Sequence, residues 1–233
     1  MWPTAHIFEW YTSQRRSLVG AVRRLTVLVV ANRKVAAGAV ISVVAVLASV
    51  FGYFAWGSKQ EANAADLLFK AAGQLAVSRG TAEDLKKDEE AVQLLREVTT
   101  RYPRTAAAAE ATLRLGNRFY ALENYDEARA VYQSYLSKNP RGRIAFSAGI
   151  GMGDTYVAQR KYDKAVETYL GLINRFPQDP LLPQAYLNLA RTYLNMNKTH
   201  DAVRLYEKIA ETHPNMEWGQ NAEAQLRKLR LTQ

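Results

Sequence analysis

The sequence predicts an all-α protein: a single transmembrane helix, then a solenoid of about 3.5–4 helical hairpins, then a C-terminal capping helix. Three observations lead to this fold class. Residues 35–56 form an uninterrupted run without a charged side chain. Alanine, proline and aromatic positions recur every 37 residues over most of the remaining chain. The chain of 233 residues has no cysteine, which excludes disulfide frameworks, Cys-ligated metals and thiol nucleophiles.

Residues 1–34 are predicted to be a basic cytoplasmic tail. They contain six Arg or Lys against a single acid, Glu9, whereas residues 57–233 contain 25 basic and 21 acidic residues. A nucleic-acid partner would require a basic face on the folded part, so none is expected. Within the tail, residues 18–31 are apolar around two arginines and too short to span a bilayer. They fit either an interfacial helix on anionic lipid or a flank that only sets orientation.

Residues 35–56 are expected to cross the membrane. As a helix they would measure about 33 Å, which matches a hydrocarbon core of about 30 Å. Tyr53 and Trp56 lie at the far end, as in an aromatic belt, and the basic residues before the span place residues 57–233 on the opposite side. Two alternatives remain: a signal peptide cleaved near Ala62-Asn63-Ala64, although this run exceeds the usual apolar core, and a buried helix of a soluble protein.

The repeat is the strongest signal in the chain. Each of the four units has a tyrosine or leucine, an alanine and a proline in one register, and the last three also have a small residue; four of the seven prolines share this register. The recurring sets are Gly116, Gly153 and Ala190; Leu95, Tyr132, Tyr169 and Tyr206; Ala91, Ala128, Ala165 and Ala202; and Pro103, Pro140, Pro177 and Pro214.

Each unit is expected to form two helices around a polar turn. Apolar residues at i, i+3, i+4 and i+7 predict both helices, and the proline ends the second one because it lacks an N–H group. Residues 57–84 are assigned to a linker and an irregular first repeat helix, which is expected near residues 62–78 and in line with the membrane helix. Residues 85–216 are assigned to the repeats, and residues 217–233 to a polar capping helix and tail.

This arrangement resembles the tetratricopeptide repeat (TPR) family. The likeness rests on Gly116, Tyr120, Tyr125, Ala128, Tyr132 and Pro140 in one copy, and on the equivalent residues in the next two copies. The family period is 34 residues, so the three extra residues predict longer turns between hairpins. The resemblance implies a TPR-like α-solenoid whose first helices line a surface that binds other proteins.

Candidate site residues follow from the repeat. Equivalent positions on the first helices give two apolar rows around a polar row, which suits an extended or helical peptide. Some of these residues could instead pack under the cap or a neighbouring unit. The rows are Leu113, Ile150 and Leu187; Asn117, Asp154 and Arg191; and Tyr120, Val157 and Leu194.

No catalytic, metal or cofactor site is expected. The glycines at 149, 151 and 153 look like a phosphate loop, but Gly153 occupies the small-residue position of the repeat inside a predicted helix. Acid pairs such as Glu89 and Glu90 fit solvated helix surfaces. The sequence therefore predicts a non-enzymatic module that works by contact.

The layout of tail, span and repeats is similar to the ancillary subunit of the bacterial SecYEG translocon. The resemblance rests on residues 32–34, 51–53 and 62–66, and it implies an inner-membrane protein whose repeats face the periplasm and pass translocated proteins to chaperones. The alternative is a scaffold or assembly subunit of another envelope complex: secretion, pilus, outer-membrane assembly or respiratory. The expected partners are translocon, chaperone or envelope-complex subunits, with lipid contacting residues 35–56 and, in the interfacial-helix interpretation, 18–31.

Overall fold

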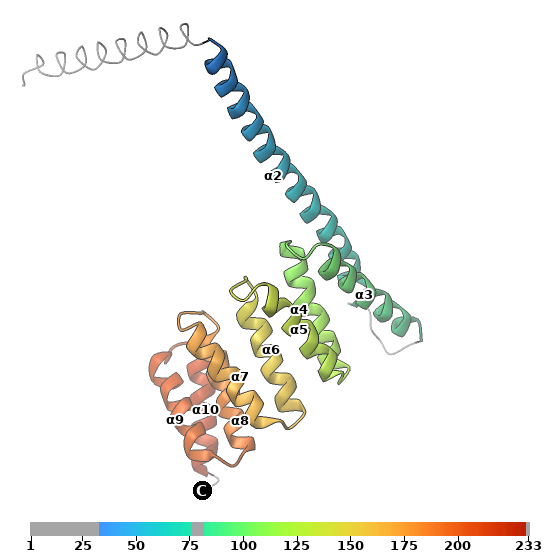
Figure 1. Ribbon diagram of the computed structural model, residues 1–233. Coiled ribbons are helices and arrows are strands. Elements are labelled where there is room, and N and C mark those ends of the chain that lie inside the picture. Colours follow the sequence, from blue (N-terminus) through green and yellow to red (C-terminus); the bar gives the residue numbers. More distant parts are fainter. Residues whose placement is uncertain (1–32, 76–81, 232–233) are drawn as a thin grey trace, which may run out of the picture. The chain divides into compact units, whose positions relative to one another are not determined.

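The computed structural model describes residues 33–75 and 82–231, all helices and the turns between them. The predictions for the tail before residue 33 lie outside these residues, as do those for 76–81 and for 232–233. The chain forms two compact units, Met1–Lys59 and Gln60–Gln233 (Figure 1).

Helix α2, Arg33–Leu75, begins before the predicted span and continues into the repeat unit. The uncharged run and the expected first repeat helix therefore belong to one helix. In the N-terminal unit its apolar side chains are exposed: Val35, Ile41, Phe51 and Phe54 are each 68–76% exposed. In the second unit, Ala64 and Ala71 of the same helix are buried with Leu95 and Val98. Apolar side chains of α2 are thus exposed in the N-terminal unit, whereas others are buried in the repeat unit.

The repeat unit contains the predicted hairpins in chain order (Figure 1). Helix α3 pairs with the C-terminal part of α2, and α10 follows the last hairpin as the expected cap. The first helices are α4 (Ala106–Ala121), α6 (Ala145–Ala158) and α8 (Leu182–Asn195). The second helices are α3 (Ala82–Arg101), α5 (Tyr125–Lys138), α7 (Tyr162–Arg175) and α9 (Thr199–Thr212), and α10 spans Glu217–Leu231.

The three turns inside the hairpins share one conformation. Glu123, Arg160 and Asn197, each 37 residues apart, all have a φ of 59°. In the first turn the Asn124 N–H donates to the Phe119 carbonyl at 2.9 Å and the Glu123 N–H donates to the Tyr120 carbonyl at 3.0 Å, and the other two turns repeat this pattern. This is a Schellman motif with a left-handed residue after the helix end, and it satisfies carbonyls that the helix leaves free.

The packing of the two kinds of helix differs. Consecutive first helices contact one another, α4 with α6 and α6 with α8, and α8 also contacts the capping helix α10. The described second helices do not contact one another, so α4, α6 and α8 each form a floor between two second helices. We call the side formed by α4, α6 and α8 the first-helix face, and the side formed by α3, α5, α7 and α9 the second-helix face.

Glycines allow the recurring tyrosines to enter the core. A Cβ atom at Gly116 would lie 2.4 Å from the Tyr132 ring, and one at Gly153 would lie 2.4 Å from the Tyr169 ring. Both rings, like that of Tyr206, are almost fully buried. Glycine at these two positions therefore lets the paired helices approach closely.

The glycine run of α6 has a packing role at every position. Gly149 faces Leu172, Gly151 faces the Tyr132 ring of the preceding hairpin, and Gly153 faces Tyr169, each so closely that a Cβ atom would overlap the neighbour. All three lie within a helix that contacts α5 and α7. The geometry is that of a helix packed on two sides, whereas a phosphate loop lies between a strand and a helix.

Polar contacts join the irregular first hairpin to the next one. The Glu61 carboxylate accepts hydrogen bonds from the backbone N–H groups of Ala106 (2.8 Å) and Ala107 (2.9 Å), which lie at the N-terminus of α4. A carboxylate there also interacts favourably with the helix dipole. Nearby, Asp88 of α3 pairs with Arg118 of α4, and the Asp88 side chain is 9% exposed.

Candidate protein-interaction site

The first apolar row of the predicted groove is only partly available at the surface. Leu113 and Ile150 are half-buried on α4 and α6. Leu187, the equivalent residue of α8, is 1% exposed because it packs in a cluster with Ala222 and Leu226 of α10. The capping helix therefore covers this end of the row, and two residues of the three remain accessible.

The second apolar row is more open. Tyr120 is 38% exposed, and Val157 and Leu194 are half-buried at equivalent places on α6 and α8. The Tyr120 ring stacks edge to face with Tyr125 across the turn, with ring centroids 5.3 Å apart. The accessible apolar surface of the first-helix face is thus centred on Leu113, Tyr120, Ile150 and Val157.

The polar row between them is fixed in place by the buried tyrosines. The Tyr132 hydroxyl donates to Asn117 Oδ1 at 2.7 Å, and the Tyr169 hydroxyl donates to Asp154 Oδ1 at 2.5 Å. Asn188 Nδ2 of the next hairpin also donates to Asp154 Oδ1, at 2.9 Å. Asn117 and Asp154 therefore have a structural role, and their remaining polar atoms keep a defined orientation.

Asp154 is a carboxyl group of this face whose pKa departs from its ordinary value. Burial raises the pKa of Asp154, while the hydrogen bonds from Tyr169 and Asn188 and the positive charge of Arg191 oppose the rise. Burial also raises the pKa of Tyr169 and of Tyr206, and the charge of Arg191 opposes the rise at Tyr206. Arg191, the third member of the polar row, is thus an exposed cation beside the buried Tyr206.

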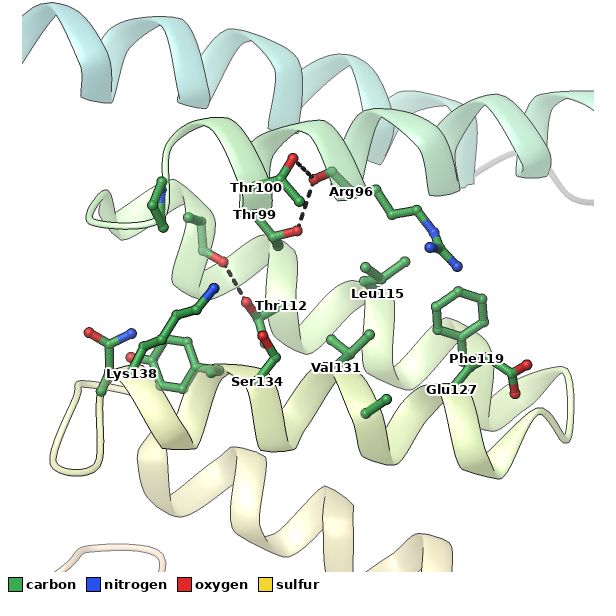
Figure 2. Close-up of a pocket in the computed structure, with 15 residues that line it drawn as sticks. Arg96, Thr99, Thr100, Thr112, Leu115, Phe119, Glu127, Val131, Ser134 and Lys138 are labelled. Carbon is green, nitrogen blue, oxygen red and sulfur yellow. Dashed lines mark hydrogen bonds between the residues drawn. The ribbon is translucent and has the colours of Figure 1, made fainter.

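The second-helix face carries hollows that the sequence analysis did not predict. Figure 2 shows the first of them, with a volume of about 320 Å³, and we call it the α3–α5 groove. Its floor is α4, with Thr112, Leu115 and Phe119, and its walls are α3 and α5. Arg96 and Glu127 lie at the Phe119 end, and Lys138 lies at the opposite end (Figure 2).

A second hollow of about 490 Å³, the α5–α7 groove, has the same construction. All of its lining residues lie 37 positions after lining residues of the α3–α5 groove. Gln133 replaces Arg96, Lys164 replaces Glu127, Arg175 replaces Lys138 and Tyr156 replaces Phe119. A related hollow, formed mainly by α8 and α9, includes Tyr186 and Lys208.

The sequence contains signals for some of these features. Asn117 and Tyr132, Asp154 and Tyr169, and Arg191 and Tyr206 are each 15 residues apart, which is the interval between the polar row and its tyrosines. The second-helix grooves follow from the same repeat once the contacts between helices are known. Nothing in the local pattern around Glu61 indicates that it reaches the N-terminus of α4, 45 residues ahead.

Within residues 33–75 and 82–231, His, Asp and Glu side chains do not gather in a group of three that could hold a metal ion. The hollows are open surfaces lined by apolar, hydroxyl and single charged side chains. This arrangement suits recognition of another macromolecule by surface complementarity.

Comparisons with known proteins agree with the fold. Among solved structures, a tetratricopeptide repeat protein from Parabacteroides merdae ATCC 43184 matches with a TM-score of 0.54 and 18% identity. The match covers 72% of this chain and 60% of that one, so the chain spans less than two thirds of its length. At this identity the likeness supports the fold alone.

Two other solved structures are more distant. A putative kinesin light chain from Podosopora anserina with TPR-like repeats gives a TM-score of 0.49 at 16% identity, covering 69% of this chain and 92% of that one. MamA gives 0.45 at 16% identity, covering 62% and 84%. No curated protein matches the chain significantly.

Sequence profiles identify the family. The tetratricopeptide repeat-like domain matches residues 31–170, and the tetratricopeptide repeat matches residues 184–215. TPR folds are typically non-catalytic scaffolds that bind other proteins. With more than half of its length matched and its hairpins in register, the chain belongs to the tetratricopeptide repeat-like domain family.

Proposed function

We propose that this protein is a non-enzymatic, membrane-anchored interaction module whose repeats face the periplasm and assist protein translocation or the transfer of translocated proteins to chaperones at the inner membrane. The observation that carries the proposal is the direct junction of an exposed apolar helix to a TPR array. One described helix, α2, is long and apolar enough to cross a membrane, and none of its most apolar window is buried.

The chemistry of α2 supports an anchor in lipid. Its Ser42 hydroxyl donates to the Gly38 carbonyl at 2.9 Å, and its Ser49 hydroxyl donates to the Ala45 carbonyl at 2.8 Å. The two serine hydroxyl groups of the span are thus satisfied within the helix, as hydrocarbon requires. The basic residues before the span favour a cytoplasmic N-terminus.

The first-helix face supports binding of an unfolded or extended client. Leu113, Tyr120, Ile150 and Val157 offer apolar surface, and Asn117 Nδ2 remains next to them as a donor because Oδ1 accepts from Tyr132. Extended segments are recognised by such a combination of apolar contacts and fixed polar groups.

A single-cysteine experiment tests the topology. The chain has no cysteine, so Ser17→Cys and Ser137→Cys each create one thiol without a background. We expect a membrane-impermeant maleimide, added to cells with a permeabilised outer membrane, to label Ser137→Cys at once and Ser17→Cys only after lysis. Labelling in the reverse order, or loss of the tail from the mature chain, would contradict the proposed anchor.

Photo-crosslinking tests the role in translocation. A photoreactive residue at Leu113 or Ile150 should crosslink to a nascent chain arrested in the translocon, and the same residue at Lys198, in a turn, should not. If no crosslink forms and the protein instead co-purifies in fixed stoichiometry with one envelope complex, it is a scaffold subunit and the translocation role is wrong.

A further inference from the structure

The α3–α5 and α5–α7 grooves of the second-helix face share a charge pattern. Each has a cation at both ends: Arg96 and Lys138 in the α3–α5 groove, and Lys164 and Arg175 in the α5–α7 groove. None of these four cations has an ion-pair partner among the described residues. Each groove also contains one unpaired carboxylate, Glu127 or Glu167, so each retains a net positive charge.

In both grooves a cation lies next to the aromatic side chain of the floor helix, but a residue at a different repeat position supplies it in each groove. The Arg96 guanidinium lies 5.2 Å from the centre of the Phe119 ring, and Lys164 Nζ lies 5.9 Å from the centre of the Tyr156 ring. Phe119 and Tyr156 are equivalent in the repeat, but Arg96 comes from the wall before the floor helix and Lys164 from the wall after it. In the hollow formed by α8 and α9, Lys208 Nζ lies 4.4 Å from the Tyr186 ring, although these two residues are not the repeat equivalents of the pairs above.

The three threonine hydroxyl groups of the α3–α5 groove are already occupied. Thr100 and Thr99 donate to the Arg96 carbonyl at 2.8 and 3.0 Å, and Thr112 donates to the Ala108 carbonyl at 2.8 Å (Figure 2). Because these donors are used within their own helices, the middle of the groove offers methyl groups and the side chains of Leu115 and Val131. Such a surface accepts apolar side chains and offers little to a sugar or nucleotide.

We propose that the α3–α5 and α5–α7 grooves each dock an amphipathic helix of a partner protein, with apolar residues inserted in the groove and acidic residues at its two ends. The α5 lining residues Glu127, Val131, Ser134 and Lys138 extend over three helical turns, or about 16 Å. A helix of this length presents anchors at i, i+4 and i+7. The volume of about 320 Å³ accommodates two or three apolar side chains.

Charge complementarity selects the partner. Four unpaired cations placed at groove ends favour carboxylates and disfavour lysine or arginine at the same places. This surface lies on the opposite side of the first helices from the proposed client face. The chain could therefore hold a folded partner on the second-helix face while it binds a client on the first-helix face.

The test uses the full chain in lipid nanodiscs and a fluorescent helical peptide of about 14 residues, with leucine at i, i+4 and i+7 and glutamate on both flanks. A peptide with lysine in place of glutamate and a scrambled acidic peptide are the controls. We expect micromolar binding of the acidic peptide that weakens with salt, and at least tenfold weaker binding of both controls.

Variants at equivalent positions test the grooves directly. The combined changes Arg96→Glu, Lys138→Glu, Lys164→Glu and Arg175→Glu should abolish binding, and Glu127→Lys should strengthen it. Ser134→Trp and Gly171→Trp occupy equivalent exposed positions that line the two grooves, so together they should block both. Ser137→Trp, exposed outside the lining, and Lys161→Glu with Lys198→Glu are matched controls that should leave the affinity unchanged.

Three results would overturn the proposal: equal binding of the basic peptide, undiminished binding by the doubly blocked variant, or hydrogen-exchange protection on the first-helix face instead of residues 94–103, 127–139 and 164–176. Self-association of the chain that disappears with Arg96→Glu and Lys138→Glu would make a second copy the occupant and would also refute it. The client-binding proposal is tested separately by photo-crosslinking at Leu113 and Ile150, which line neither groove.

Discussion

At the scale of single residues, the 37-residue period includes two positions, Gly116 and Gly153, that have no room for a side chain. Gly116 and Gly153 are buried in helix interiors, where glycine costs about 0.5–1 kcal/mol relative to alanine. The cost is offset because each glycine admits a tyrosine ring that is almost fully buried. Sequence analysis identified this role for Gly153 from the repeat, but the contacts of Gly149 and Gly151 required the helices on both sides.

Alanine at these glycines should therefore be destabilising. Gly116→Ala and Gly153→Ala each place a methyl group about 2.4 Å from a buried ring, and the resulting overpacking should lower the free energy of unfolding by about 1–3 kcal/mol. Gly171→Ala, exposed in α7 with no atom within 4 Å of the new Cβ, should instead raise it by up to about 1 kcal/mol. Urea unfolding of the three variants measures the contrast. Equal effects at all three positions would refute the close-packing explanation.

The turn residues with positive φ give a prediction of the opposite sign. Glu123 and Arg160 adopt a left-handed conformation that costs an L-residue roughly 1–2 kcal/mol. Glu123→Gly and Arg160→Gly should therefore stabilise the fold, by about 0.5–1 kcal/mol after the greater freedom of the unfolded chain is counted. Asn197→Gly should change stability less, because asparagine tolerates this conformation. Thermal unfolding would contradict the explanation if Asn197→Gly gave the largest gain.

At the scale of elements, Asp154 ties three helices together. It lies on α6 and accepts hydrogen bonds from Tyr169 of α7 and Asn188 of α8, so a single carboxylate oxygen joins one hairpin to the next. The tie has an electrostatic cost, since burial raises the pKa of the carboxyl group. The folded chain therefore holds this proton to a higher pH than the unfolded chain does.

The sign of the pH dependence follows. In the unfolded chain the pKa of an aspartate carboxyl group is about 3.9. The contribution of Asp154 to the free energy of unfolding therefore falls as the pH rises above this value, and it becomes constant above the raised pKa of the folded chain. In Asp154→Asn, the amide oxygen can still accept both hydrogen bonds but no charge is buried. We expect this variant to be more stable than the wild type at pH 7, with the difference shrinking as the pH falls towards 4. Chemical unfolding at both pH values, with the exposed Glu207→Gln as control, checks this; a larger gain in acid would contradict it.

At the scale of the whole repeat unit, each hairpin is stabilised by its neighbours. Helix α10 contacts only α8 and α9, and its Ala222 and Leu226 cover Leu187, Tyr206 and Ile209. In a linear array of this kind, damage at one end weakens the adjacent unit first.

Removal of residues 217–233 should therefore act locally. Hydrogen exchange should accelerate in α8 and α9, where the cluster under α10 becomes exposed, and it should change little in α4 and α5. A truncated chain that unfolds as one unit would show that the array is more cooperative than its nearest-neighbour contacts indicate. Leu226→Ala, which leaves α10 in place, should give a milder form of the same pattern with a loss of about 2 kcal/mol.

Much of the fold was predictable because the repeat reports on packing. The 37-residue register gave the hairpins, their ends and the cap, since glycine, tyrosine and proline have roles that depend on local geometry. The sequence also placed Leu113, Ile150 and Leu187 at equivalent positions, but it could not show that α10 buries the third. It did not reveal the second-helix grooves or the contact of Glu61 with α4, because both depend on which distant helices meet. The proposed binding faces remain predictions that the experiments above test.

The identical conformation of the three hairpin turns has a consequence for how such a chain can grow. Because the turns at Glu123, Arg160 and Asn197 share one left-handed conformation and the helices around them repeat the same contacts, an in-frame duplication of 37 residues there would meet similar surfaces on both sides. Each added repeat would then add one docking groove, and the first and last helices of the array would not have to change.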